Sequence, residues 1–327
     1  MFARLNTCLK FGAISLMFAA LCAHAQDATR YPSKPVRFIV PASAGGPSDV
    51  IARLVAERLG QALGQTVVVE NRPGAGGATG LIAVAKASPD GYTLGMGATG
   101  ALTIGPHLPD APPLNPQTQL QPLAKVADIP LVLVAGPASG LGSLQTLLSR
   151  ARTADVPLAN SGQYTAHHLS GELLAALTRT RLVAVPYRGS APAVTDVLGG
   201  QVQAAIVDLT AAMPHIKAGT VKALAVTSAR RTRLANDIPT MAEAGVPDYD
   251  APAWMGLFLP RGVPPAVIDR LSREVQAILA KPEVQNQILA LAAEPSALPP
   301  EGFAAFIDQE SARWAKVIAS LPKPTKP

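Results

Sequence analysis

The stretch VRFIVPASAGGPSDVIARLV, residues 36–55, contains in order the three parts from which the rest of the chain is built. Apart from one arginine, residues 36–40 are apolar over the length of a buried strand. A turn with two adjacent glycines follows, and apolar side chains then recur at helical spacing from residue 50 to residue 63. A strand, a tight turn and a helix in this order are typical of the βαβ units of an α/β protein.

The same succession continues along the chain. Further strands are predicted at residues 67–70, 92–96, 130–134, 157–159, 182–185, 204–207, 222–226 and 255–259. Residues 102–122 carry several prolines and no apolar period, so we expect a loop there. Helices are predicted in the C-terminal part at residues 265–280, 282–291 and 301–318. Because helices separate most of the strands, the sequence predicts an α/β fold with parallel sheets.

The N-terminus has the order of a secretory signal. Basic residues precede an apolar run, residues 11–23, which is too short to span a bilayer, and Ala23–Ala25 is a small-x-small cleavage site. We expect residues 1–25 to be removed after Ala25 and the mature chain to be released into the periplasm. A lipoprotein anchored through Cys22 is the alternative, which Leu21 disfavours because a small residue is needed at that position.

Cysteine content and length bound the mature chain. Both cysteines, Cys8 and Cys22, lie in the predicted signal, so disulfides, thiol catalysis and cysteine metal sites are not expected. The remaining chain, about 300 residues, exceeds the size at which one core usually divides. We predict lobe I from residues 26–124 and 229–327, and lobe II from residues 125–228. The two crossings between them would act as a hinge.

Charge and composition exclude two classes of partner. The net charge is +6, but the basic residues are scattered and aromatic residues make up 4% of the chain. A nucleic-acid surface needs clustered basic residues, with aromatic side chains on which bases stack, so no nucleic-acid partner is expected. After the signal, no apolar run of membrane-spanning length is free of charges or prolines.

Small-residue turns follow several of the predicted strands. In an open α/β sheet, ligands bind beyond the carboxyl ends of the strands, and helix N-termini there attract carboxylates or phosphates. A single turn of this kind can equally be an ordinary turn with Ser48 or Asp49 as a helix cap. Several such turns at one end of a sheet favour an anion site. These turns cover residues 41–49, 71–80, 95–100 and 159–168.

Catalytic and metal motifs are not convincing. Residues 95–100 have the spacing of a dinucleotide fingerprint, but a predicted loop follows, and no acidic residue lies at the expected distance. His167 and His168 are neighbours and face different directions, and a helix-end hydrogen bond or ion pair is expected between His168 and Glu172. A phosphate-binding loop and a nucleophile elbow are missing from the sequence. We therefore expect a binding protein without cofactor or metal rather than an enzyme.

A series of motifs runs through the mature chain in order. Among them are YPSKPVRFIVP at 31–41, VENRPGAGG at 69–77, PDGYTL at 89–94, HLSGE at 168–172 and VPYRGSAP at 185–192. Together they resemble the substrate-binding proteins of tripartite tricarboxylate transporters, the Bug family. The resemblance implies a two-lobed periplasmic binding protein of type II, with two crossing strands, that closes on a small organic acid like a Venus flytrap.

The resemblance also implies which residues bind the ligand. The first-lobe turns would hold a carboxylate through backbone N–H groups and waters, and second-lobe side chains would face them. Carried onto this sequence, the ligand-binding residues are Ser43, Ala44, Gly45, Ser48, Asp49, Gly76, Gly77, Ala78, Thr99 and Gly100 in lobe I, and Ser161, Gln163, Thr165, His168 and Asp208 in lobe II. Ala42–Ala44 replaces an aromatic residue and prolines of the family pattern, which leads to the hypothesis of an acid with an apolar body, such as an aromatic acid.

Two partners are compatible with this family. As a transport receptor, a monomeric binding protein would pass its ligand to a membrane permease with large and small subunits. As an orphan receptor, it would present its ligand state to a sensor kinase. We expect the first, with the second as the alternative.

Overall fold

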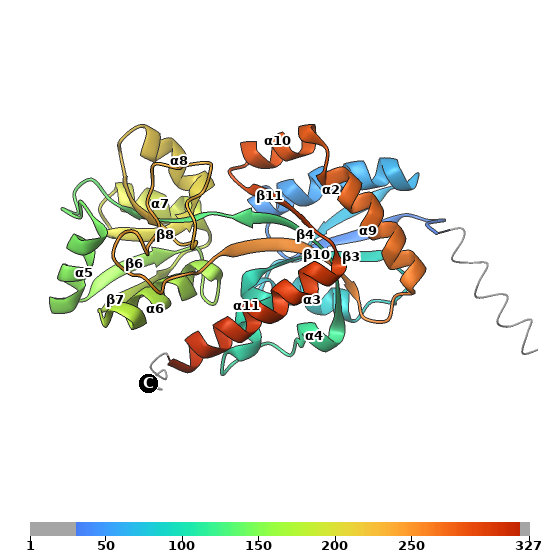
Figure 1. Ribbon diagram of the computed structural model, residues 1–327, viewed down its shortest axis with the longest axis horizontal. Helices are drawn as coiled ribbons and strands as arrows, with labels where there is room; N and C mark the ends of the chain where they lie inside the picture. Colours follow the sequence, from blue (N-terminus) through green and yellow to red (C-terminus); the bar gives the residue numbers. More distant parts are fainter. Residues whose placement is uncertain (1–30, 321–327) are drawn as a thin grey trace, which may run out of the picture.

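The computed structural model describes residues 31–320, and the predicted signal peptide lies outside this range. Figure 1 shows two lobes, each built on a β-sheet with helices on both faces, joined by long strands that run from one lobe towards the other. The predicted two-lobed α/β architecture is confirmed. We use lobe I for the part with the six-stranded sheet and lobe II for the part with the five-stranded sheet.

The lobe I sheet has the strand order β11-β4-β10-β3-β1-β2. Its strands are β1 (Val36–Val40), β2 (Val67–Asn71), β3 (Thr93–Ala98), β4 (Leu120–Ile129), β10 (Ala253–Pro260) and β11 (Glu294–Leu298). Alternate side chains of β1 serve two cores because successive residues of a strand point to opposite faces. Phe38 packs in the core that includes α2 (Pro47–Leu63) and α9 (Pro265–Leu279), whereas Ile39 packs with Phe303 in the core on the other face.

The lobe II sheet has the order β7-β6-β8-β5-β9. Its strands are β5 (Leu131–Ala135), β6 (Val156–Asn160), β7 (Leu182–Pro186), β8 (Ala204–Asp208) and β9 (Lys222–Val226). Helices α5 (Leu144–Thr153) and α6 (Ala166–Thr178) contribute to the core on one face. Helices α7 (Ser190–Leu198) and α8 (Leu209–Lys217) contribute to the core on the other face.

The remaining helices belong to lobe I. They are α3 (Ala78–Ala85), α4 (Pro116–Gln119), α10 (Pro282–Ala290) and α11 (Pro300–Ser320). In helix α9, the apolar spacing predicts the buried face correctly. Its apolar residues recur every three or four positions and are all buried: Val267, Leu271, Val275 and Ile278. Asp269 and Arg273 on the opposite side are exposed, so burial of one stripe defines the helix.

The prediction of parallel sheets was wrong in part. Strand β10 pairs antiparallel with β3 and β4, and β5 pairs antiparallel with β8 and β9. These are the strands next to the crossings, and they enter their sheets from the direction of the other lobe. The strands connected by helices within one lobe, such as β1 and β2, are parallel.

Two further expectations need correction. Residues 102–122 are not a simple loop, because helical turns at Gly100–Ile104 and Gly105–His107 precede α4, and β4 begins at Leu120. Residues 100–104 are buried, and Ala101 and Leu102 pack in the core of lobe I, so tertiary packing rather than an apolar period in the sequence holds these turns. Strand β11 was missed because a proline lies within its five residues and interrupts the strand pattern.

The crossings lie at the ends of β4 and β9. Pro130 alone separates β4 from β5, and residues 227–252 connect β9 to β10. Thr227 and Ala251 bind each other through two hydrogen bonds, from the Thr227 hydroxyl and from the Ala251 amide, and so join the start and end of the second crossing. The predicted lobe boundaries fall inside β4 and just after β9, and they stay a prediction.

Candidate ligand-binding cleft

A cavity of about 170 Å³ lies between the lobes and is lined from both sides. Drug-sized ligands occupy pockets of about 300–1,000 Å³, so this inner cavity suits a metabolite of few carbons. Lobe I contributes Pro47, Ser48, Gly76, Ala98, Thr99, Gly100, Ile129 and residues 253–255, and lobe II contributes Thr165, Ala166, His167 and Asp208.

Two outer cavities continue the cleft on either side of the inner one. The first, of about 400 Å³, shares Gly76 and Gly100 with the inner cavity and is lined mainly by apolar groups, including Leu108 and Leu114. The second, of about 470 Å³, shares Pro47 and Asp208 with it and includes the guanidinium-bearing residue Arg188. One groove therefore runs between the lobes, and Arg188 lies at one of its ends.

Two long helices begin at the inner cavity from opposite lobes. Helix α2 begins with Pro47 and Ser48, and helix α6 begins with Ala166 and His167; all four residues line the cavity. The first N–H groups of a helix have no intrahelical partners and carry the positive end of the helix dipole. Because no side chain caps α2 at Gly46, this N-terminus can bind a carboxylate from the ligand.

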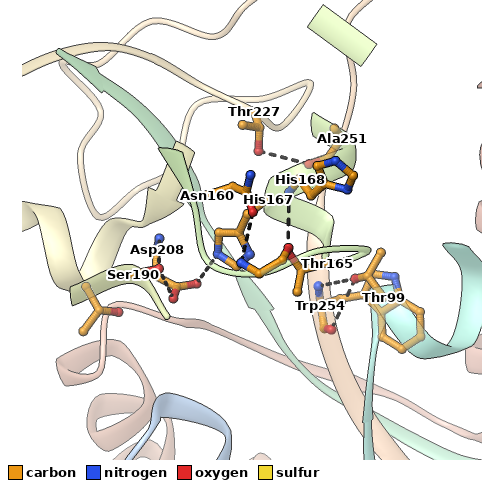
Figure 2. Close-up of polar contacts among 12 residues, drawn as sticks. Thr99, Asn160, Thr165, His167, His168, Ser190, Asp208, Thr227, Ala251 and Trp254 are labelled. Carbon is orange, nitrogen blue, oxygen red and sulfur yellow. Dashed lines mark hydrogen bonds and ion pairs between the residues drawn. The ribbon is translucent and has the colours of Figure 1, made fainter. Parts of the chain in front are cut away.

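The wall of lobe II carries a polar cluster of three side chains. His167 Nε2 lies 3.0 Å from Asp208 Oδ1, and the Ser190 hydroxyl donates to Asp208 Oδ2 at 2.8 Å (Figure 2). Burial would raise the pKa of Asp208, but the charge and hydrogen bond of His167 and the bond from Ser190 outweigh it and lower the pKa. Asp208 is therefore ionised at neutral pH, and His167 Nε2 is the donor in their contact.

Asp49 was predicted to bind ligand, and the structure places it under the first loop. Its carboxylate accepts hydrogen bonds from the Gly45 amide at 2.9 Å, Arg53 Nε at 2.9 Å and Asn71 Nδ2 at 2.8 Å. Burial acts to raise its pKa, but these three donors outweigh burial and hold the pKa below the ordinary value. With its side chain 3% exposed, Asp49 positions the loop that precedes α2.

Two neighbouring histidines are used differently. His168 Nδ1 accepts from the Tyr164 amide at 3.2 Å, and its Nε2 lies 3.6 Å from Glu172, which confirms the expected pairing along the helix. His167, which the sequence prediction left out of the site, lines the inner cavity instead. Successive residues of a helix point about 100° apart, so only one of the two can face the cleft.

The structure brings most of the predicted residues to the cleft. Ser48, Gly76, Thr99, Gly100, Thr165 and Asp208 line the inner cavity, and Gly45, Ala78, Ser161 and Gln163 line the outer ones. Ser43, Ala44, Gly77, Asp49 and His168 do not line these three cavities. The sequence analysis missed Pro47, His167, Arg188, Ser190 and Trp254; for His167, the signal was its position in the first turn of a predicted helix after a small-residue loop.

Thr99 lies at the inner cavity, but its hydroxyl is bound to β10. The Thr99 Oγ1 accepts from the Trp254 backbone amide at 2.9 Å, and both residues are about 1% exposed (Figure 2). We expect Thr99→Val to destabilise the protein by about 1–3 kcal/mol, because it leaves a buried amide without its partner. Chemical denaturation measures this, with the exposed Thr195→Val as control; a large loss of ligand affinity at unchanged stability would contradict the assignment.

Within residues 31–320, His, Cys, Asp and Glu side chains do not form a group of three that could hold a metal ion. Over the same range, every helix is too short or too polar to cross a membrane.

Comparisons with known proteins agree with this architecture. A family model described as the tripartite tricarboxylate transporter family receptor matches residues 51–322. Protein BugT of Bordetella pertussis is 39% identical over 295 residues, which cover 89% of this chain and 90% of BugT.

Solved structures are similar over the same extent. The periplasmic binding protein BugD superposes with a TM-score of 0.78 at 38% identity, over 88% of this chain and 98% of BugD. A protein of R. palustris solved with adipate has a TM-score of 0.80 at 34% identity, over 89% and 98% of the two chains. MatC from Rhodopseudomonas palustris, solved with bound malate, has a TM-score of 0.78 at 30% identity, over 88% and 100%. The chain therefore belongs to the tripartite tricarboxylate transporter receptor family, as its motifs indicated, and is a periplasmic solute-binding protein rather than an enzyme.

Proposed function

We propose that the protein captures a small organic acid in the cleft between its lobes and delivers it to the permease subunits of a tripartite tricarboxylate transporter. The observation that carries this proposal is the uncapped N-terminus of α2, which faces the N-terminus of α6 across a cavity of about 170 Å³. Similar proteins solved with adipate and with malate support a carboxylate as the ligand.

The ligand contacts assigned in this proposal come from both lobes. Backbone N–H groups of Ser48 and of the turn at Gly76 hold the carboxylate, while Thr165 and Asp208 contact the rest of the ligand from lobe II. Residues 227–252 and the junction at Pro130 form the hinge. The protein acts as a monomer released from residues 1–25 by cleavage after Ala25.

A thermal-shift screen of residues 26–327 tests ligand capture. The panel holds mono- and dicarboxylic acids, amino acids and aromatic acids, each with its amide as the control that lacks the charge. An acid at 100 times its dissociation constant stabilises the native state by about 2.7 kcal/mol. For a protein of this size that corresponds to a rise in Tm of roughly 5–10 °C. If no acid shifts the transition of a cooperatively folded sample, the proposal of carboxylate capture is wrong.

The delivery step needs its own measurement. Radiolabelled uptake of the acid by cells with and without the gene distinguishes transport from signalling. Loss of uptake supports the permease as partner, whereas intact uptake with a lost transcriptional response to the acid supports a sensor kinase instead.

A further inference from the structure

Asp208 is the one carboxylate among the described residues that line the inner cavity, and it stays accessible there. Its side chain is 18% exposed, whereas the side chain of Asp49 on the other side of the cleft is 3% exposed. Asp208 also lines the second outer cavity, so a ligand that extends from the inner cavity in this direction lies beside it.

Two neighbouring side chains donate hydrogen bonds to the Asp208 carboxylate and so keep it in the ionised form, which can only accept. Each of its oxygens receives one donor, His167 Nε2 at 3.0 Å and the Ser190 hydroxyl at 2.8 Å. An ionised carboxylate has about four acceptor sites and no donor, so roughly two sites remain for the ligand. His167 makes this contact through Nε2, and its other nitrogen, Nδ1, is buried without a partner among the described residues.

Other charged groups near the cleft leave this acceptor in place. Asp49 is neutralised by Arg53 and hydrogen-bonded by Asn71. On helix α6, the imidazole of His168 is paired with Glu172. Arg188 lines the second outer cavity and not the inner one. The inner surface of lobe II therefore presents an anion, while the inner surface of lobe I presents the N-terminus of α2.

This asymmetry restricts what can bind. A ligand carboxylate placed against Asp208 would be repelled, so it is directed to the N-terminus of α2 in lobe I. The part of the ligand that meets lobe II gains most when it donates a hydrogen bond to Asp208, because a hydrogen bond to a charged group contributes about 1.5–3 kcal/mol. Resting on the proposed carboxylate capture, we infer that Asp208 selects small acids with a hydroxyl or ammonium group close to the carboxylate, and rejects acids that lack this donor.

Isothermal titration with matched acid pairs tests the inference on the wild-type protein alone. Each pair differs by one hydroxyl group: malate and succinate, lactate and propionate, mandelate and phenylacetate. For every skeleton that binds, we expect the hydroxy acid to bind at least about tenfold more tightly, the equivalent of 1.4 kcal/mol. If both members of a bound pair have equal affinity, the inference is overturned while carboxylate capture stands. If no acid and no amino acid binds, carboxylate capture itself fails.

The variant Asp208→Asn assigns the selectivity to this residue. It removes the charge and keeps the size, so the hydroxy acid should bind less tightly while the plain acid binds as well as before or better. The ratio of the two affinities within each acid pair should then fall below about threefold. General damage to the cleft would weaken both acids together, and an unchanged tenfold difference would overturn the role of Asp208. The control is Asp155→Asn, an exposed carboxylate of lobe II outside the cleft, which should behave as wild type.

Discussion

Replacing Gly100 by valine is expected to weaken ligand binding by about 5- to 150-fold while both lobes stay folded. A Cβ atom on Gly100 would lie 3.1 Å from the carbonyl oxygen of Tyr164 and 3.4 Å from Cα of Thr165. Both atoms belong to the backbone of lobe II, so they cannot move away as a side-chain end would. Overpacking of this kind costs about 1–3 kcal/mol, and each 1.4 kcal/mol is a factor of ten in affinity.

The steric cost arises only when the lobes come together. The backbone of Gly100 lies outside the left-handed region, so valine at this position is not strained within lobe I. Titration calorimetry gives the affinity, and small-angle scattering with saturating ligand shows whether the variant becomes as compact as wild type. The control is Gly142→Val, where a Cβ meets open space. Wild-type affinity and compaction in Gly100→Val would show that the lobes do not close at this contact.

The second large effect concerns stability, and it centres on Glu310 in α11. Its side chain is 7% exposed, and its Oε1 lies 2.7 Å from Nη2 of Arg313. Arg313 also pairs with Asp250 on the crossing between the lobes. Burial raises the pKa of Glu310 from 4.5 to about 7, against the lowering effect of Arg313 and Lys125. The folded protein therefore keeps this proton at pH values where the unfolded chain releases it.

The direction of the pH dependence follows from this difference in proton binding. Where the native state binds more protons than the unfolded chain, stability falls as pH rises, here from about 4.5 through 7. We expect Glu310→Gln, which imitates the protonated acid, to be more stable than wild type at pH 8. At 1.36 kcal/mol per pKa unit, the gain is on the order of 3 kcal/mol, and it should vanish towards pH 4.

Urea denaturation at pH 4, 6 and 8 measures this gain. Asp308→Asn on the same helix is the control, because Asp308 is exposed and bonds only weakly to Gln117 at 3.3 Å. A variant at Glu310 that is less stable than wild type at pH 8 would mean that the ion pair with Arg313 outweighs the cost of burying the charge.

Residues 36–63 show what could be predicted from local pattern. The strand β1, the turn with two glycines and the helix α2 are all present within a few residues of their predicted bounds. Apolar spacing reports which face of an element is buried, and that information lies in the order of the residues themselves. The same reasoning failed for β11, where a proline hides the strand, and for the buried helical turns after β3.

The α/β class, the family and the turns that gather at the cleft could be inferred from the sequence, which also predicts a signal peptide. Which side chains in those turns are available to a ligand depends on the tertiary structure. Asp49 is occupied by Arg53 and Asn71, and Thr99 by a backbone amide that lies 155 positions away in the chain. Asp208 is paired with His167 from another element. Such partners are brought together by packing between distant segments, and no local spacing encodes them.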